Sequence, residues 1–183
     1  MSEIAILSGS PSAYSRSEQV LKYLGTLLKQ EDFSVTHISV KDVPPETLFS
    51  GDFDTPAIRE IATLTQAAKG VIVGSPVYKG AYSGVLKALL DILPQDVLKH
   101  KPVLPLMTGG SMSHLLAIEY ALKPVLATLK GYNLKGIYVL DSQIDKQKKN
   151  PIVDEDILQR TKKQLHYFVE LVYKQNALAA SLY

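Results

Sequence analysis

The chain has 183 residues, of which 20 are basic and 18 are acidic, and its formal net charge is +2. This length predicts a single domain with a substantial hydrophobic core, and the near balance of charge gives no reason to expect nucleic acid or an anionic membrane as a partner. The absence of cysteine excludes thiol catalysis, a CxxC redox pair and disulfides, so any redox chemistry must depend on a bound cofactor.

The N-terminal half of the chain alternates between strand and helix patterns. Short apolar or alternating runs predict the strands, and apolar residues spaced by three and four positions predict the helices. In chain order they give a strand over residues 4–7, a helix over 19–29, a strand over 33–40, a helix over 56–68 and a strand over 70–74. Thr55 and Pro56 are the expected cap and first position of the second helix, whereas residues 41–55 contain prolines and a glycine and are expected to form a loop. His37 lies on the polar face of the second strand, where we expect it to be solvated.

The C-terminal half continues this alternation. It gives a helix over residues 84–93, a strand over 102–107, a helix over 114–130, a strand over 135–140 and a helix over 154–175. Ser83 is the expected cap of the first of these helices. Pro105 cannot donate a hydrogen bond to a neighbouring strand, which predicts a bulge or a gap in pairing. Pro124 removes the donor that the carbonyl of Tyr120 would use, which predicts a kink or a π-bulge between these two residues.

Five strands alternating with five helices predict an α/β three-layer sandwich with helices on both faces of a five-stranded parallel sheet. The expected strand order is 2-1-3-4-5, in a single domain over residues 1–175 that is followed by a tail over 176–183. Ligands of such folds bind beyond the carboxyl ends of the strands. Three Gly-rich and Ser-rich loops follow the first, third and fourth strands: the first loop (residues 8–17), the second loop (75–84) and the third loop (108–111). We expect all three to surround one crevice.

The first loop has the chemistry of a phosphate site. It holds five serines and Arg16, and it leads into a helix whose first backbone N–H groups have no partner within the helix. It contains neither GxGxxG nor a Gly-Lys-Ser/Thr sequence, which argues against a dinucleotide pyrophosphate and a nucleoside triphosphate. A mononucleotide monophosphate therefore fits best, and the alternative is that serine and glycine only form the turn.

The second and third loops are suited to a planar ring, because glycines let the backbone approach the ring and bond to its edge. Tyr78 and Tyr82 can contact such a ring or pack on a neighbouring subunit, and His114 can flank the ligand or make a structural hydrogen bond. No Ser-His-Asp spacing is present, and we expect no metal site from the four scattered histidines, which are His37, His100, His114 and His166.

Several motifs together resemble the NADPH-dependent FMN reductase family, in particular its members from two-component alkanesulfonate monooxygenase systems. The motifs are Gly9-Ser10-Pro11 with Ser15-Arg16-Ser17, residues 75–87, Thr108-Gly109-Gly110, residues 114–116 and residues 120–126. The resemblance implies a flavodoxin-like fold, FMN and NADPH, and hydride transfer from NAD(P)H to flavin N5. It also implies that reduced FMN passes to a flavin-dependent monooxygenase in sulfonate assimilation. The matching Tyr120 implies a π-helix at the interface of a homo-oligomer, a dimer or tetramer.

The resemblance also assigns parts of the cofactor to residues. Ser10, Ser15, Arg16 and Ser17 would hold the phosphate, Pro76 to Lys79 would line the ribityl chain and ring, and Thr108 to Ser111 would meet the ring edge. The full set that we assign to the cofactor is Ser8, Ser10, Ser15, Arg16, Ser17, Pro76, Val77, Tyr78, Lys79, Gly80, Ser83, Thr108, Gly109, Gly110, Ser111 and His114. We name no catalytic residue, because hydride transfer between stacked rings needs proximity rather than an acid or a base.

Two other functions remain open from the sequence. One is reduction of quinones or azo dyes by NAD(P)H, and the other is a flavodoxin-like electron carrier or redox-sensing module. Flavodoxins are usually acidic, so the net charge of +2 counts against the second. The sequence begins without a signal peptide and contains no run long enough to span a bilayer, so we expect a cytoplasmic protein with no membrane partner.

Overall fold

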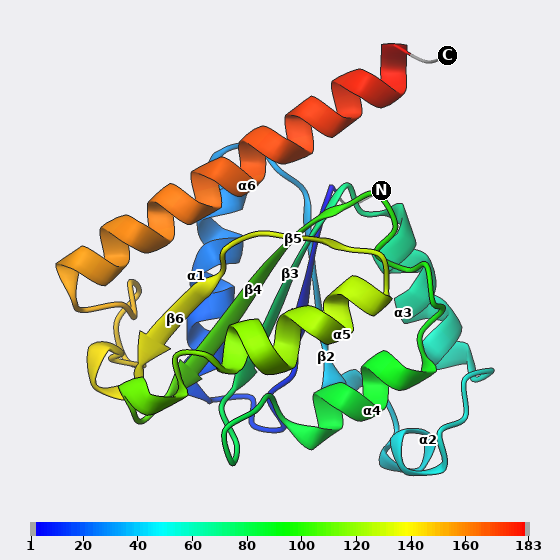
Figure 1. The fold of residues 1–183 in the computed structure, drawn as a ribbon, viewed down its shortest axis with the longest axis horizontal. Coiled ribbons are helices and arrows are strands. Elements are labelled where there is room, and N and C mark those ends of the chain that lie inside the picture. Colours follow the sequence, from blue (N-terminus) through cyan, green and yellow to red (C-terminus); the bar gives the residue numbers. More distant parts are fainter. Residues whose placement is uncertain (1–2, 182–183) are drawn as a thin grey trace.

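Parallel strands form a single sheet at the centre of the protein. The computed structural model describes residues 3–181, and it describes side chains over residues 3–175. The strands are β1 (Ile4–Ser8), β2 (Val35–Ser39), β3 (Gly70–Pro76), β4 (Pro102–Gly109), β5 (Tyr132–Asn133) and β6 (Ile137–Leu140). Their order is β2-β1-β3-β4-β5, and β6 also pairs with β4 (Figure 1). This confirms the predicted fold class and strand order, with the fifth position shared by β5 and β6.

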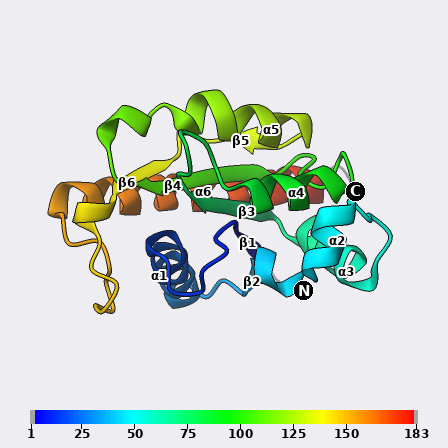
Figure 2. The ribbon, with the colours of Figure 1, turned by 90° about the horizontal axis from the view of Figure 1, so that it is seen from below.

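Helices cover both faces of the sheet (Figure 2). The α-helices are α1 (Arg16–Gln30), α2 (Pro45–Ser50), α3 (Pro56–Ala67), α4 (Gly84–Ile92), α5 (Lys123–Thr128) and α6 (Glu155–Ser181). Short 3₁₀ helices are η1 (Val40–Asp42), η2 (Met112–His114) and η4 (Asp141–Gln143). Buried side chains of α3, α4 and α5 form one core with Ala5, Val71 and Val73, whereas α1 and α6 form a second core with Ile4 and Ile72. Alternate strand residues therefore face different helices, as expected for a sheet buried on both sides.

Glycines in β3 let two helices lie close to the sheet. A Cβ atom at Gly74 would lie 2.7 Å from Leu21 Cδ1 of α1, and one at Gly70 would lie 2.6 Å from Val172 Cγ2 of α6. Both partner side chains are fully buried, so neither can move aside into solvent. The close approach of α1 brings its N-terminus next to the end of β1.

Pro105 lies opposite a break in strand pairing, as predicted. On one side, β4 pairs with β3 without interruption, and Pro105 lies opposite Val73. On the other side, β5 pairs with Pro102 and Val103, and β6 begins pairing only at Leu106. Gly136, with φ of +93°, lies in the interval between β5 and β6, and a Cβ atom there would be 3.0 Å from the Pro105 ring. The strand next to β4 on this side is thus interrupted at the position where Pro105 has no N–H to donate.

The distortion predicted near Pro124 is a π-helix, η3 (Ile118–Leu122), which leads directly into α5. Lys123 N–H donates to the carbonyl of Ile118, five residues earlier. Pro124 has no N–H to donate to the carbonyl of Tyr120, as an α-helix would require. The wider π-helical turn just before it forms the bond from Lys123 to Ile118 instead. Of the two predicted alternatives, the π-bulge is therefore the one that forms.

The structure differs from the predicted secondary structure at four places. The predicted helix over 114–130 is divided, because residues 112–114 form η2 and the regular helical turns resume with η3 and α5. Residues 41–55 contain η1 and α2 rather than a loop alone, because Pro45 begins α2 and Gly51, with φ of +69°, ends it. The short strand β5 was not predicted. Helix α6 ends at Ser181 rather than near residue 175, so the helix continues into the predicted tail; residues 182–183 of that tail lie outside the described residues. None of the described helices is long and apolar enough to cross a membrane.

The packing of Gly74 gives a stability prediction. Gly74→Ala should lower the free energy of unfolding by about 1–3 kcal/mol, the usual effect of overpacking a core. Gly84→Ala is the matched control, because nothing lies within 4 Å of a Cβ atom there. It should leave the stability unchanged or raise it by up to about 1 kcal/mol. Urea unfolding of both variants measures the difference, and equal stability would contradict the assigned packing of α1.

Candidate functional site

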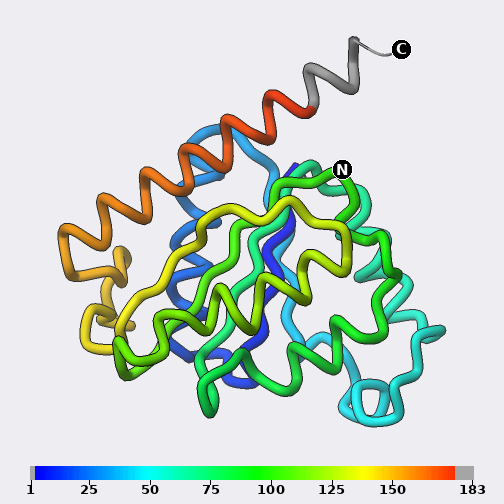
Figure 3. The backbone as a smooth tube through the Cα atoms, in the orientation of Figure 1, coloured from blue at the N-terminus to red at the C-terminus, as the bar shows by residue number. Residues whose placement is uncertain are grey.

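The first, second and third loops meet at the carboxyl ends of β1, β3 and β4. Figure 3 shows the blue first loop and the green second loop side by side at the lower edge of the sheet. Ser83 Oγ donates to the carbonyl of Gly9, which joins the second loop to the first. Val77 N–H donates to the carbonyl of Thr108 at 2.8 Å, which joins the second loop to the third. The structure therefore brings together the three loops that the sequence singles out.

The first loop gathers hydroxyl groups at the N-terminus of α1. Ser15 caps the helix, and its Oγ accepts from Glu18 N–H at 3.1 Å and lies 3.2 Å from Ser17 Oγ. Ser10 Oγ donates to the carbonyl of Ser12 at 3.0 Å, which folds the start of the loop. Arg16 is the first residue of α1 and is half exposed, in contrast to the buried Ser10 and Ser17. Serine hydroxyls, free helix N–H groups and a guanidinium together form a donor set for a phosphate.

A buried carboxylate lies behind the first loop. Ser8 Oγ donates to Glu18 Oε2, and His37 Nε2 lies 3.0 Å from Glu18 Oε1. Lys22 Nζ lies 3.5 Å from the same oxygen. Ser8 was assigned to the cofactor from the sequence, but it donates its hydroxyl proton to Glu18. His37 is also bound to Glu18 rather than simply solvated, which corrects the prediction made from its place on the strand.

The surroundings of Glu18 favour its charged form. Burial raises the pKa of this carboxyl, but hydrogen bonds from His37 and Ser8 and the charges of His37 and Lys22 outweigh burial. The pKa of Glu18 therefore lies below its usual value. Sequence reasoning missed this cluster because Glu18 lies just before the apolar pattern of α1 and its hydrogen-bond partners, Ser8 and His37, lie on β1 and β2.

The second loop is a tight hairpin at its tip. Tyr78 N–H donates to the carbonyl of Ala81 at 2.8 Å, and Ala81 N–H donates back to Tyr78 at 3.1 Å. Lys79 and Gly80 between them have φ of +50° and +81°, the conformation of a type I′ turn. This geometry exposes Tyr78, Lys79 and Gly80, whereas Tyr82 is half buried and packs against the core. Tyr78 is therefore available to a ligand, and Tyr82 has a structural role.

The base of the second loop is held by Ser83, the cap of α4. Its Oγ accepts from Leu86 N–H at 3.1 Å, and its own N–H donates to Ser75 Oγ at 2.9 Å. Pro76 and Val77 are half buried at the end of β3. Ser83 is only 1% exposed, so it fixes the loops rather than presenting a hydroxyl to a ligand.

The third loop has one packed glycine and one open glycine. A Cβ atom at Gly109 would lie 2.5 Å from Tyr138 Oη, and this phenol donates to the carbonyl of Ser111 at 2.6 Å. A Cβ atom at Gly110 would meet only Asp141 Oδ2, at 3.8 Å, so it would fill open space above the loop. Thr108 is buried at the end of β4, and His114 is half buried at the end of η2. The open backbone at Gly110 can approach a flat ring.

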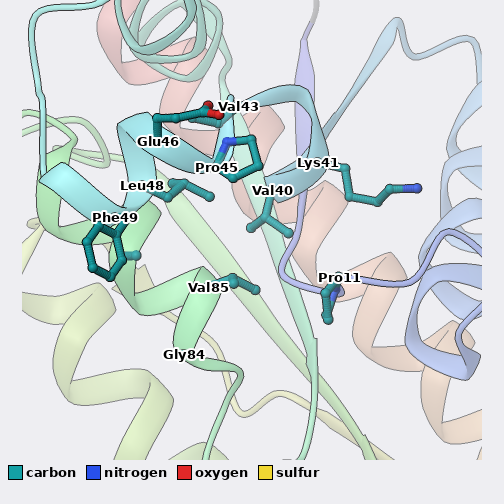
Figure 4. A pocket seen from close by; sticks show the side chains of 11 residues that line it. Pro11, Val40, Lys41, Val43, Pro45, Glu46, Leu48, Phe49, Gly84 and Val85 are labelled. Atoms are coloured by element: carbon teal, nitrogen blue, oxygen red, sulfur yellow. The ribbon is translucent and has the colours of Figure 1, made fainter.

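An apolar groove of about 780 Å³ adjoins the first loop (Figure 4). It lies between α2 and the start of α4, with Pro11 of the first loop at its edge. Its polar side chains are Lys41 and Glu46, and the rest of its lining is apolar: Pro11, Val40, Val43, Pro45, Leu48, Phe49, Gly84, Val85 and Ala88. The groove differs in chemistry from the hydroxyl-rich first loop. It was missed because residues 41–55 were predicted to be a loop.

The fold and the three loops at one sheet edge define a flavodoxin-like α/β protein. A flavodoxin from the domain Archaea shares this fold, with a TM-score of 0.59 and 15% identity over 93% of this chain and 98% of that chain. The chain belongs to the NADPH-dependent FMN reductase family, whose profile matches residues 2–146. "FMN reductase (NADPH)" of Escherichia coli (strain K12) is 40% identical over 98% of this chain and 94% of its own length. The apo form of the NADH:FMN oxidoreductase EMOB has a TM-score of 0.80 and 34% identity, covering 92% of this chain and 88% of that chain.

The three loops, which lie within the described residues, do not bring together a set of metal-ligating side chains. Within the described residues, His, Cys, Asp and Glu side chains nowhere form a group of three or more that could hold a metal ion. The polar groups of the first loop are hydroxyls, backbone N–H groups and the guanidinium of Arg16. They can bind and orient a ligand.

The Glu18 cluster predicts how stability changes with pH. Because the pKa of Glu18 is lowered on folding, its contribution is present above pH 4.5, the usual value, and is lost as the pH falls through the lower folded value. Glu18→Gln should therefore lower the free energy of unfolding by about 1–3 kcal/mol at neutral pH and by less in acid. Glu60→Gln, at an exposed position of α3, is the control and should change little. The free energy of unfolding of both proteins is measured from neutral pH into acid. A difference between Glu18→Gln and the wild type that stays constant with pH would contradict the role of Glu18.

Proposed function

We propose that the protein is an NAD(P)H-dependent FMN reductase that transfers a hydride from NADPH to FMN. The observation that carries this proposal is the donor set of the first loop at the N-terminus of α1, next to an open backbone at Gly110. Membership of the NADPH-dependent FMN reductase family supports it. The donor set suits one phosphate, and the open backbone suits a flat ring.

The phosphate end of FMN would lie at the first loop. Ser10, Ser15, Arg16 and Ser17 would hold it, together with the free N–H groups of the first turn of α1. The positive end of the helix dipole favours an anion at this position, and the fork of Arg16 matches two phosphate oxygens. Ser8 contributes indirectly in this proposal, because its hydroxyl already bonds to Glu18.

The ring end of FMN would lie over the second and third loops. Pro76 and Val77 would line the ribityl chain, and the exposed Tyr78, Lys79 and Gly80 would border the ring. Thr108, Gly109, Gly110 and Ser111 would meet the ring edge through their backbone, and His114 would flank it. The support is the open space above Gly110 and the exposure of the hairpin tip.

The protein's part in the reaction is positioning. When bound, FMN supplies a ring that accepts a hydride. In this proposal, the second and third loops would hold that ring beside the open backbone at Gly110 and would leave room for a nicotinamide. Proximity and alignment of two stacked rings can supply much of the rate without an acid or a base from the chain. We accordingly assign no catalytic residue.

We further propose that reduced FMN passes to a flavin-dependent monooxygenase, in sulfonate assimilation. The half-exposed Arg16 supports exchange of FMN rather than permanent burial. We also propose that the protein is a homo-oligomer, a dimer or tetramer, joined through η3. Four large apolar side chains around this π-helix are exposed, namely Met112, Leu115, Leu116 and Tyr120. Light scattering at several protein concentrations tests the assembly, and a monomer at all of them would contradict it.

The reductase function predicts FMN-dependent oxidation of NADPH by the purified protein. Arg16→Ala should raise the Kd for FMN about 10- to 100-fold, since hydrogen bonds to charged groups contribute about 1.5–3 kcal/mol. Riboflavin, which lacks the phosphate, should bind both forms equally. Flavin fluorescence measures both affinities, and Arg59→Ala on α3 is the charge-matched control.

Several results would contradict this proposal. Tight FMN binding without NADPH oxidation would favour an electron carrier, and faster reduction of a quinone or an azo dye than of FMN would favour the alternative acceptors. Equal loss of FMN and riboflavin in Arg16→Ala would show that Arg16 does not bind the phosphate.

A further inference from the structure

The segment that follows β6 packs against the first loop. Asp141, at the start of η4, places Oδ2 3.9 Å from Arg16 Nη1. Ile144 and Ile152 then pair as an antiparallel bridge and close the 144–152 loop. This loop carries three lysines near its tip, Lys146, Lys148 and Lys149. Of these lysines, Lys146 is the one with contacts to the first loop, where the candidate phosphate site lies.

Lys146 is fixed to the first loop by three contacts with Tyr14. Lys146 Nζ donates to the carbonyl of Tyr14 at 3.2 Å and lies 4.5 Å from the centre of the Tyr14 ring. Tyr14 Oη in turn donates to the carbonyl of Lys146 at 3.3 Å. A lysine side chain is flexible, and these contacts hold its ammonium group next to a loop residue that is two positions before Arg16.

The charge of Lys146 is available to a ligand. Within the described residues, no carboxylate forms an ion pair with Lys146, whereas Arg16 is paired with Asp141. An ammonium group has three N–H donors. One of them is used by the carbonyl of Tyr14 and another faces the ring, which leaves a donor for an oxygen of a bound anion.

We propose that Lys146 is a further residue that binds the phosphate of FMN and helps the protein select FMN over flavins without a phosphate. This inference rests on the proposed function, because it takes the first loop as the phosphate site. Its chemistry is the attraction between an ammonium and a phosphate across the rim of the loop. Such attraction weakens with salt, whereas a purely structural contact between Tyr14 and Lys146 would act on every flavin alike.

Titration of the full-length protein with FMN and with riboflavin, at low and high salt, tests this role. Lys146→Met removes the charge and keeps most of the side chain, and it should raise the Kd for FMN about three- to tenfold at low salt. The Kd for riboflavin should not change, and the salt dependence of FMN binding should decrease. Lys146→Arg should restore most of the affinity. Lys148→Met, in the same loop, is the matched control and should stay within about twofold of the wild type.

The following outcomes would overturn the inference. Equal weakening of FMN and riboflavin by Lys146→Met would show a structural role, and unchanged FMN binding would show no role. An equal effect of Lys148→Met would show a general effect of charge. If the wild type itself binds FMN and riboflavin equally, the assignment of the first loop to the phosphate fails together with this inference, whereas a lack of NADPH oxidation would overturn the proposed function. If the wild type prefers FMN and oxidises NADPH while Lys146→Met matches it, only this inference fails.

Discussion

The parallel pairing of β1 with β3 and of β3 with β4 is the constraint on which the candidate site depends. It places the ends of three neighbouring strands at one edge, so the loops that follow them must meet there. The Ser83 hydroxyl then joins the second loop to the first, because it binds the Gly9 carbonyl while it caps α4. Since Gly74 allows α1 to lie against β3, the N-terminus of that helix joins the same edge. Sheet geometry, one cap and one glycine together position the donor set.

Charge is separated across the first loop. Behind the loop, Glu18 is buried and paired with His37 and Lys22, so its negative charge is balanced within the protein. In front of the loop, the half-exposed Arg16 is paired with Asp141, and Lys146 contacts Tyr14 without forming an ion pair within the described residues. In the proposed site, a phosphate at the N-terminus of α1 would lie near Arg16, and Lys146 would add a second cation. The proposed FMN site follows from this separation of charge, because a carboxylate left unpaired behind the loop would oppose the ligand.

Local rules explain most of what could be predicted from the sequence. Pro105 and Pro124 each lack an N–H group. The gap beside β4 follows from the first of these, and the π-helix η3 follows from the second. The alternation of strands and helices was enough to predict the fold and to predict that the three loops meet at one edge of the sheet. The pairing of Glu18 with His37 was not predictable in this way, because it depends on how α1 packs on the sheet. The contact between Tyr14 and Lys146 joins residues 132 positions apart, and nothing in either local segment indicates it.

Amide hydrogen exchange of the full chain, with and without FMN, tests the central claim that three loops form one flavin site. The account predicts that FMN slows exchange in the first, second and third loops together, and that riboflavin protects the second and third loops but leaves the first loop unchanged. Protection confined to one loop, or found instead along the apolar groove between α2 and α4, would contradict it.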